Sequence, residues 1–210
     1  MEALDTNAIK MIVHHLKDLM DEQRDHLLEL DRAIGDGDLG LTMTKAFAAA
    51  DEEASAWEEQ LPGKLLMKLG MTIAKSAPST MGTLLATGFM RGGKAVGDAR
   101  AIDTDLLARF FRAFVEGIIE RGKTKPGNKT VVDALYPAAE SLEKSAASGY
   151  DLKVALEAAA QAADDGREAA KGMESQHGKA AIFRRQTIGI EDPGAYVGAL
   201  ILQGFFEAVP

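Results

Sequence analysis

Apolar residues recur every three or four positions along most of the chain, with charged residues between them. Near the N-terminus, Ile9, Ile12 and Leu16 show this spacing, which places apolar side chains on one face of a helix. The pattern predicts eight helices, over about residues 9–30, 41–57, 65–75, 82–96, 104–121, 130–147, 151–173 and 193–208. No hairpin signal and no strand alternation interrupts them, so we expect an all-α fold of antiparallel helices. No linker divides residues 1–210, which are expected to form one domain.

Residues that favour helix starts stand before several of these segments. Ser79 or Thr80 follows a break in the pattern and is expected to cap the helix over 82–96. Thr104 is expected to cap the next helix, and Pro193 stands where proline favours the first helical position. The functional residues are therefore expected in the loops between these helices.

Composition and charge exclude several classes of protein. The core must rest on aliphatic residues, because apolar residues make up 46% of the chain and aromatic residues only 6%. The net charge of −8, from 24 basic and 32 acidic residues, argues against a nucleic-acid binder. No run approaches the roughly 18 apolar residues of a membrane span, and no signal peptide is evident. The absence of cysteine excludes a thiolate metal site and a cysteine nucleophile. We expect a cytoplasmic protein with no nucleic-acid or membrane partner.

The glycine-rich segment 31–40 is the strongest chemical feature of the chain. Asp31, Asp36 and Asp38 place three carboxylates within eight residues, at the end of a predicted helix. Such carboxylates repel one another unless a cation lies among them, and Mg²⁺ prefers oxygen ligands of this kind. The alternative is a solvated acidic turn that uses Gly and Asp for positive φ. The local sequence leaves both interpretations open.

Two glycine patterns imitate phosphate-binding motifs. The segment 35–40 matches GxGxxG, but no strand precedes it and aspartates would face the pyrophosphate. The segment 88–95 nearly matches a P-loop, but it lacks the final Ser or Thr and lies within a predicted helix. We interpret the second pattern as helix packing.

Other loops offer weaker signals with ordinary alternatives. The segment 77–84 precedes a helix and could hold phosphate at the helix start, although an ordinary N-cap explains it as well. The segment 121–129 carries one arginine and three lysines, which form either a cationic site or a solvated loop. The histidines show no zinc spacing, so we assign them to surface or packing roles. They are His14, His15, His26 and His177.

Three segments together resemble the nucleotide-binding L subunit of dihydroxyacetone kinase. They read DRAIGDGDLG at 31–40, RGKTKPGNKT at 121–130 and IGIEDPGA at 188–195. The resemblance extends over essentially the whole chain and implies an eight-helix antiparallel up-and-down barrel. It also implies a site for ADP or ATP and two Mg²⁺ ions at one end of that barrel.

The resemblance assigns roles to individual residues. The implied Mg²⁺ ligands are Asp31, Asp36 and Asp38. The residues implied to lie beside the nucleotide are Leu39, Gly40, Leu41, Thr42, Thr80, Met81, Gly82, Gly122, Val131, Lys179, Asp192, Pro193 and Gly194. No residue is assigned as catalytic.

The chain departs from the family pattern at several of these positions. Leu39 stands where the family usually has histidine, and Lys179 where it commonly has arginine. Asn128 replaces a usual aspartate. The segment 78–83 reads PSTMGT, where the family has a phosphate loop rich in glycine with a serine. The three aspartates are intact, so we expect nucleotide chemistry to be retained.

The resemblance also implies partners. A separate K subunit holds the short keto-sugar that receives the phosphoryl group, and in one form of the enzyme an M subunit rephosphorylates bound ADP. Two alternatives remain open: an ATP-dependent kinase subunit for another ketose such as erythrulose, and a non-catalytic nucleotide-sensing regulator. A homodimer is also left open.

Overall fold

The computed structural model describes residues 3–210, and helices dominate this part of the chain. The α-helices are α1 (Thr6–Glu22), α2 (Arg24–Ile34), α3 (Leu39–Ala56), α4 (Pro62–Ser76), α5 (Thr80–Val96), α6 (Thr104–Gly122), α7 (Val131–Ala147), α8 (Leu152–Ala170) and α9 (Pro193–Glu207). Two short 3₁₀-helices, η1 (Lys179–Ile182) and η2 (Arg184–Thr187), lie between α8 and α9. Residues 3–210 form no strand, so the predicted all-α class is confirmed.

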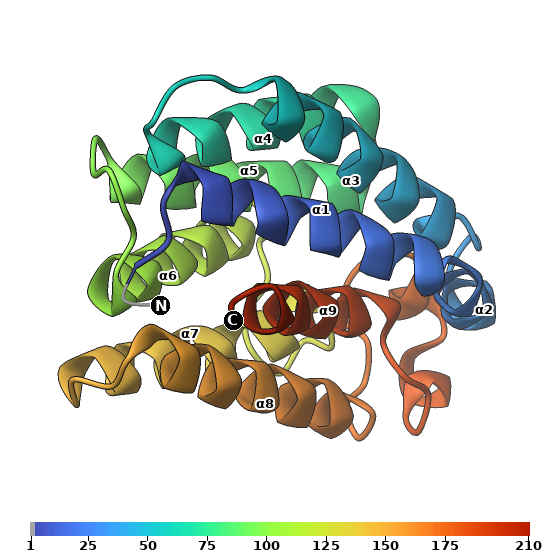
Figure 1. Cartoon of the computed structure of the whole chain (residues 1–210). Coiled ribbons are helices and arrows are strands. Elements are labelled where there is room, and N and C mark those ends of the chain that lie inside the picture. The colour runs from blue at the N-terminus through green and yellow to red at the C-terminus, as the bar shows by residue number, and fades with distance from the viewer. Residues whose placement is uncertain (1–2) are drawn as a thin grey trace.

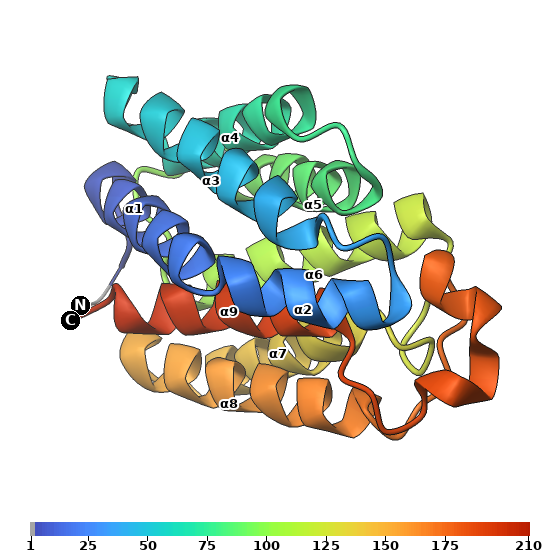
Figure 2. The ribbon, with the colours of Figure 1, turned by 90° about the vertical axis from the view of Figure 1, so that its right-hand side faces the viewer.

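Eight of the helices form a closed ring. Each of α3 to α8 contacts the next helix along the chain, and α1 closes the ring by contacting both α3 and α9. Figures 1 and 2 show this barrel from two directions, with α9 between α1 and α8. The additional helix α2 lies outside the order of the ring, against α3 and α9. The expected eight-helix barrel is therefore present, with one further helix.

The extra helix arises from a break in the first predicted helix. The pattern over 9–30 predicts one helix, but the structure ends α1 at Glu22 and begins α2 at Arg24. Gln23 lies at the break, and its side-chain oxygen accepts a hydrogen bond of 2.9 Å from the hydroxyl of Tyr196 in α9. Apolar spacing continues on both sides of the break, so periodicity alone does not reveal it.

Most predicted helix starts agree with the structure. Ser79 caps α5 by accepting a hydrogen bond of 3.0 Å from the N–H of Gly82. The predicted cap at Thr104 is wrong, because the carboxylate of Asp103 accepts the N–H of Leu106 at 2.8 Å and Thr104 is the first helical residue. Aspartate and threonine both favour this position, so the sequence did not separate two adjacent candidates.

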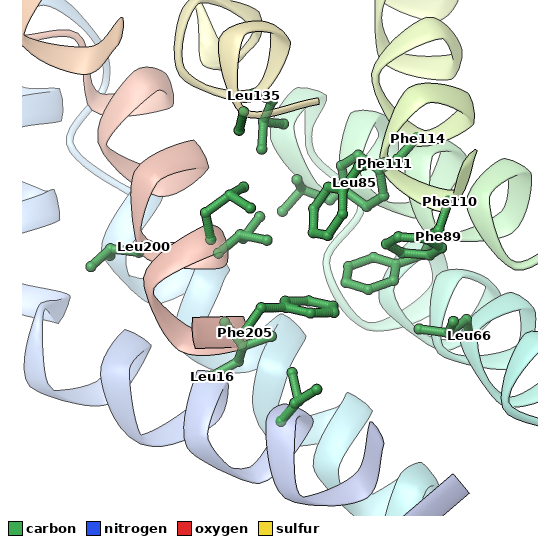
Figure 3. Close-up of a cluster of buried hydrophobic side chains, with 14 of the residues drawn as sticks. Leu16, Leu66, Leu85, Phe89, Phe110, Phe111, Phe114, Leu135, Leu200 and Phe205 are labelled. Atoms are coloured by element: carbon green, nitrogen blue, oxygen red, sulfur yellow. The ribbon is translucent and has the colours of Figure 1, made fainter. Parts of the chain in front are cut away.

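Phenylalanines from α5, α6 and α9 fill part of the barrel interior (Figure 3). The rings of Phe111 and Phe205 pack edge to face with centroids 5.1 Å apart. A Cβ at Gly88 would lie 2.7 Å from the ring of Phe114, so the glycine permits close approach of α5 and α6. This contact confirms that the 88–95 segment serves helix packing. Within residues 3–210, no helix is both long enough and apolar enough to cross a bilayer.

Candidate functional site: an acidic cleft at one end of the barrel

A cleft of about 1250 Å³ opens at one end of the barrel. Its walls come from the α2–α3 loop, the start of α5, the end of α6, the segment around η1 and the start of α9. Figure 2 shows these elements gathered at one end of the molecule. Segments far apart in the sequence therefore meet there, as expected for a binding site between helix ends.

Three aspartates at the end of α2 and in the α2–α3 loop converge on one point of this cleft. One carboxylate oxygen from each of Asp31, Asp36 and Asp38 lies within 4.8 Å of the others. Asp31 is only 9% exposed and orders the loop, because its carboxylate accepts N–H groups of Asp38 at 2.9 Å and Leu39 at 3.2 Å. A Cβ at Gly35 would lie 2.0 Å from the Asp31 carboxylate, so this close turn requires glycine. The cluster has the donor chemistry and spacing that a hard divalent cation requires.

A lysine from the opposite side of the cleft meets this cluster. The Nζ of Lys179 in η1 forms an ion pair with Oδ2 of Asp36. Hydrogen bonding to Lys179 lowers the pKa of Asp36. In return, the hydrogen bond to Asp36 and the charges of Asp38 and Asp31 raise the pKa of Lys179. One lysine thus partly balances three carboxylates.

The start of α5 forms a second wall. Pro78, Ser79, Thr80 and Met81 line the cleft there. The first N–H groups of a helix lack partners within the helix and carry partial positive charge. A Cβ at Gly82 would lie 2.0 Å from the carbonyl oxygen of Ala77, so glycine permits the tight entry into α5. This wall therefore suits an anion such as phosphate.

The end of α6 and the start of α9 form the third wall. Arg121 and Gly122 line the cleft from α6, and Pro193 and Gly194 line it from α9. Asp192 is the N-cap of α9 and does not line the cleft. It is 6% exposed, and its carboxylate accepts a hydrogen bond of 2.7 Å from the N–H of Ala195. Burial raises the pKa of Asp192 to about 7, while the Ala195 N–H and the charge of Lys129 oppose this shift.

The structure brings most of the predicted nucleotide residues to the cleft. Those in the lining are Leu39, Thr42, Thr80, Met81, Gly122, Lys179, Pro193 and Gly194. Gly40, Gly82, Val131 and Asp192 are buried and do not belong to the lining. Leu41 also lies outside the lining and is 57% exposed.

Sequence reasoning missed other residues of the cleft. Ile34, Ala74, His177, Ala180 and Ile182 line it without having been assigned to it. The surface or packing role expected for His177 is incomplete, because this residue lines the cleft and pairs its Nε2 with Oδ1 of Asn128 at 3.2 Å. Lys129 was expected in a cationic or solvated loop, but its side chain is buried. Both placements depend on the fold of the α8–α9 segment, whose sequence shows no helical apolar spacing and was interpreted as a loop.

The fold and the cleft define an all-helical protein with an acidic site at one end of a barrel. The chain belongs to the DAK2 domain family, which matches residues 33–207. It is 34% identical over 178 residues to the PEP-dependent dihydroxyacetone kinase, ADP-binding subunit DhaL, of Escherichia coli, with 85% of each chain covered. It is 31% identical over 189 residues to the corresponding subunit of dihydroxyacetone kinase 1 of Listeria innocua, covering 89% of this chain and 88% of the relative. The resemblance to the kinase L subunit is confirmed, and these relatives are named as kinases, which are phosphotransferases.

Longer kinases contain a similar region. The L-erythrulose kinase of Pectobacterium atrosepticum is 31% identical over 206 residues, which cover 94% of this chain and 35% of that enzyme. The crystal structure of the dihydroxyacetone kinase from C. freundii in complex with AMP-PNP and Mg²⁺ matches with a TM-score of 0.69 and 24% identity. That match covers 94% of this chain and 33% of the other, and it shows a shared fold.

Proposed function

We propose that this chain is the nucleotide-binding subunit of a dihydroxyacetone-type kinase. In this proposal ADP or ATP occupies the cleft with two Mg²⁺ ions held by Asp31, Asp36 and Asp38. The observation that carries the proposal is the convergence of these carboxylates within 4.8 Å, in a cleft also lined by the N-terminus of α5. Two relatives that match over most of their length, those of E. coli and L. innocua, are both named as ADP-binding subunits, and this supports the same assignment.

The cleft divides naturally into a metal side and a phosphate side. Mg²⁺ commonly binds through one or two carboxylates together with phosphate oxygens and water, so the aspartates leave room for a polyphosphate. Bound Mg²⁺ would neutralise charge that develops on the transferring phosphoryl group. The start of α5 would orient the phosphates with backbone N–H groups, and Lys179 would add a positive charge beside them. The base and ribose would lie toward Gly122 and Leu84, which line the same cleft.

The acceptor site is proposed to lie on a partner. Two exposed apolar side chains lie at one side of the cleft: Ile182, which lines it and is 81% exposed, and its neighbour Phe183, which is 42% exposed. Isolated exposed apolar residues are common, but here they stand beside a charged cleft, on the segment that carries Lys179. A ketose-binding K subunit that covers this rim would bring its sugar to the phosphoryl group and exclude water. An M subunit would then rephosphorylate ADP in place, as the PEP dependence in the relatives' names suggests.

A second candidate is an ATP-dependent kinase subunit for a different ketose. The similarity to an erythrulose kinase over 94% of this chain favours this candidate. The two candidates share the cleft chemistry and differ in the phosphoryl donor and the acceptor. The intact aspartates favour either enzyme over a non-catalytic nucleotide sensor.

One experiment separates the candidates. The purified protein is denatured and the supernatant is assayed for ADP, and then turnover with candidate K subunits is measured for dihydroxyacetone and erythrulose. Stoichiometric ADP and turnover only with the phosphoenolpyruvate phosphotransfer proteins support the first proposal. Turnover with free ATP supports the second. A protein that binds neither ADP nor ATP in the presence of Mg²⁺ contradicts both.

A further inference from the structure

The segment between α8 and α9 stands at the edge of the barrel and has few buried side chains. It carries His177, Lys179 and Ile182 to the cleft. Within residues 176–186 no side chain is buried, so this part has little apolar packing to hold it. Figure 2 shows the segment projecting beside the open end of the barrel. The position of this segment must therefore depend on the contacts made at its two ends.

A single buried lysine joins the two ends of this segment. The side chain of Lys129, in the α6–α7 loop, is 2% exposed. Its Nζ donates to the carbonyl oxygens of Lys171 at 3.4 Å and Met173 at 3.2 Å, and also to that of Thr187. Lys171 and Met173 precede the two 3₁₀-helices, and Thr187 is the last residue of η2. One ammonium group therefore joins the two ends of the segment, which we call its base. An ammonium has three donors, and all three find an acceptor.

Further hydrogen bonds near Lys129 also join the two ends of the segment to each other and to the α6–α7 loop. The N–H of Ser175 donates to Oγ1 of Thr187 at 2.9 Å, and that of Gly189 to the carbonyl of Lys171 at 2.7 Å. From the α6–α7 loop, the carbonyl of Asn128 accepts the N–H of Gln176 at 3.1 Å. The base of the segment is therefore built around the Lys129 ammonium.

Burial of this charge is unfavourable by itself, so the ammonium depends on its hydrogen-bond acceptors. Burial lowers the pKa of Lys129, and the nearby carboxylate of Asp192 opposes the decrease. The backbone of Lys129 has φ of 59°, a left-handed conformation that costs energy for a residue with a side chain. Carbonyl oxygens that converge on one point repel each other without a donor between them. The site is therefore satisfied only when the ammonium is present.

We propose that Lys129 is a positioning residue for the nucleotide site. Its ammonium closes the base of the segment 171–189 and so holds Lys179 against Asp36. This inference rests on the proposed function, because it assigns Lys129 a part in holding the nucleotide through Lys179.

The test compares Lys129→Met with Lys125→Met, an exposed lysine of the same loop. Hydrogen exchange over residues 174–188 and the rate of ADP dissociation are measured for both variants and the parent. We expect Lys129→Met to accelerate both by about tenfold, the factor for losing one good charge-assisted interaction, while Lys125→Met leaves both unchanged. Unchanged exchange in Lys129→Met overturns the inference. The exchange measurement is made without nucleotide, so it remains decisive if the parent binds no ADP and the proposed function fails.

A double-variant comparison distinguishes positioning from a general loss of stability. If Lys129 acts through Lys179, the double variant of Lys129→Met and Lys179→Met loses no more ADP affinity than Lys179→Met alone. Fully additive losses overturn the inference.

A chemical rescue tests the ammonium itself. The chain has no cysteine, so a Lys129→Cys variant can be alkylated at one site with bromoethylamine in denaturant and refolded. We expect alkylation to restore slow exchange over 174–188, and failure of a refolded, alkylated protein to do so contradicts the inference. If Lys129→Met does not fold, the Lys129→Cys protein is compared before and after this alkylation, and equal folding with equal exchange over 174–188 contradicts the inference.

Discussion

Lys179 and Asp36 lie 143 positions apart in the sequence and form an ion pair across the mouth of the cleft. The pair joins the α2–α3 loop to η1, the two elements that carry most of the charge in the site. Both side chains are about half exposed, so the pair contributes little to stability. Its consequence is functional, because a cation that enters the aspartate cluster must compete with the lysine for Asp36.

Replacement of Lys179 by methionine should separate metal binding from nucleotide binding. Without the ammonium, the cluster loses its competing cation, so Mg²⁺ alone should bind several-fold more tightly. ADP in saturating Mg²⁺ should bind about tenfold more weakly, because a charge beside the phosphates is lost. Calorimetric titrations of the parent and Lys179→Met measure both constants. Weaker binding of Mg²⁺ alone by the variant would contradict the proposed competition.

The turn at Gly35 should tolerate no side chain. In Gly35→Ala the new Cβ would meet the Asp31 carboxylate, so the loop must shift and the three oxygens must separate. We expect Mg²⁺-dependent ADP affinity to fall at least about tenfold and the free energy of unfolding to fall by about 1–2 kcal/mol. Gly172→Ala is the matched control, because the nearest atom to its Cβ would lie at 3.6 Å. Equal ADP affinity in the two variants would show that the turn does not shape the cluster.

The buried carboxyl of Asp192 should make stability depend on pH. Burial raises its pKa to about 7, above its usual value, so the folded state binds this proton more tightly than the unfolded state. The resulting stabilisation is complete below about pH 4 and is lost as the pH rises through 7. Asp192→Asn retains a capping oxygen but cannot titrate. We expect the free energy of unfolding to fall between pH 5 and pH 8 by about 2 kcal/mol more in the parent than in the variant, as measured with urea. Parallel profiles would contradict this assignment.

The apolar rim should matter for partner binding and not for the nucleotide. Phe183→Asp places a charge beside the cleft mouth but outside its lining, so turnover with a K subunit should fall by about tenfold or more. ADP affinity should stay within a factor of about two. Tyr150→Asp, a change at an exposed aromatic residue in the α7–α8 turn, serves as the control. Full turnover by Phe183→Asp would place the docking surface elsewhere.

Local patterns predicted the helices but not the long-range contacts. Apolar spacing located the barrel helices, yet it did not reveal the break at Gln23, because the period continues on both sides. The aspartate cluster was foreseen because all three residues lie within eight positions of the sequence, at the end of α2 and in the loop after it. Lys129 was not distinguished from the exposed lysines beside it, since its acceptors lie 42 to 58 residues away. Such a role depends on tertiary structure and has no local signature.

The central claim is that Asp31, Asp36 and Asp38 hold the metal that holds the nucleotide. The most direct test is the affinity for ADP with and without Mg²⁺, measured for the parent, Asp36→Asn and the control Asp98→Asn. We predict that the parent and the control bind ADP much more tightly with Mg²⁺, whereas Asp36→Asn loses most of this gain. An Asp36→Asn protein that binds Mg²⁺ and ADP as tightly as the parent would contradict the account.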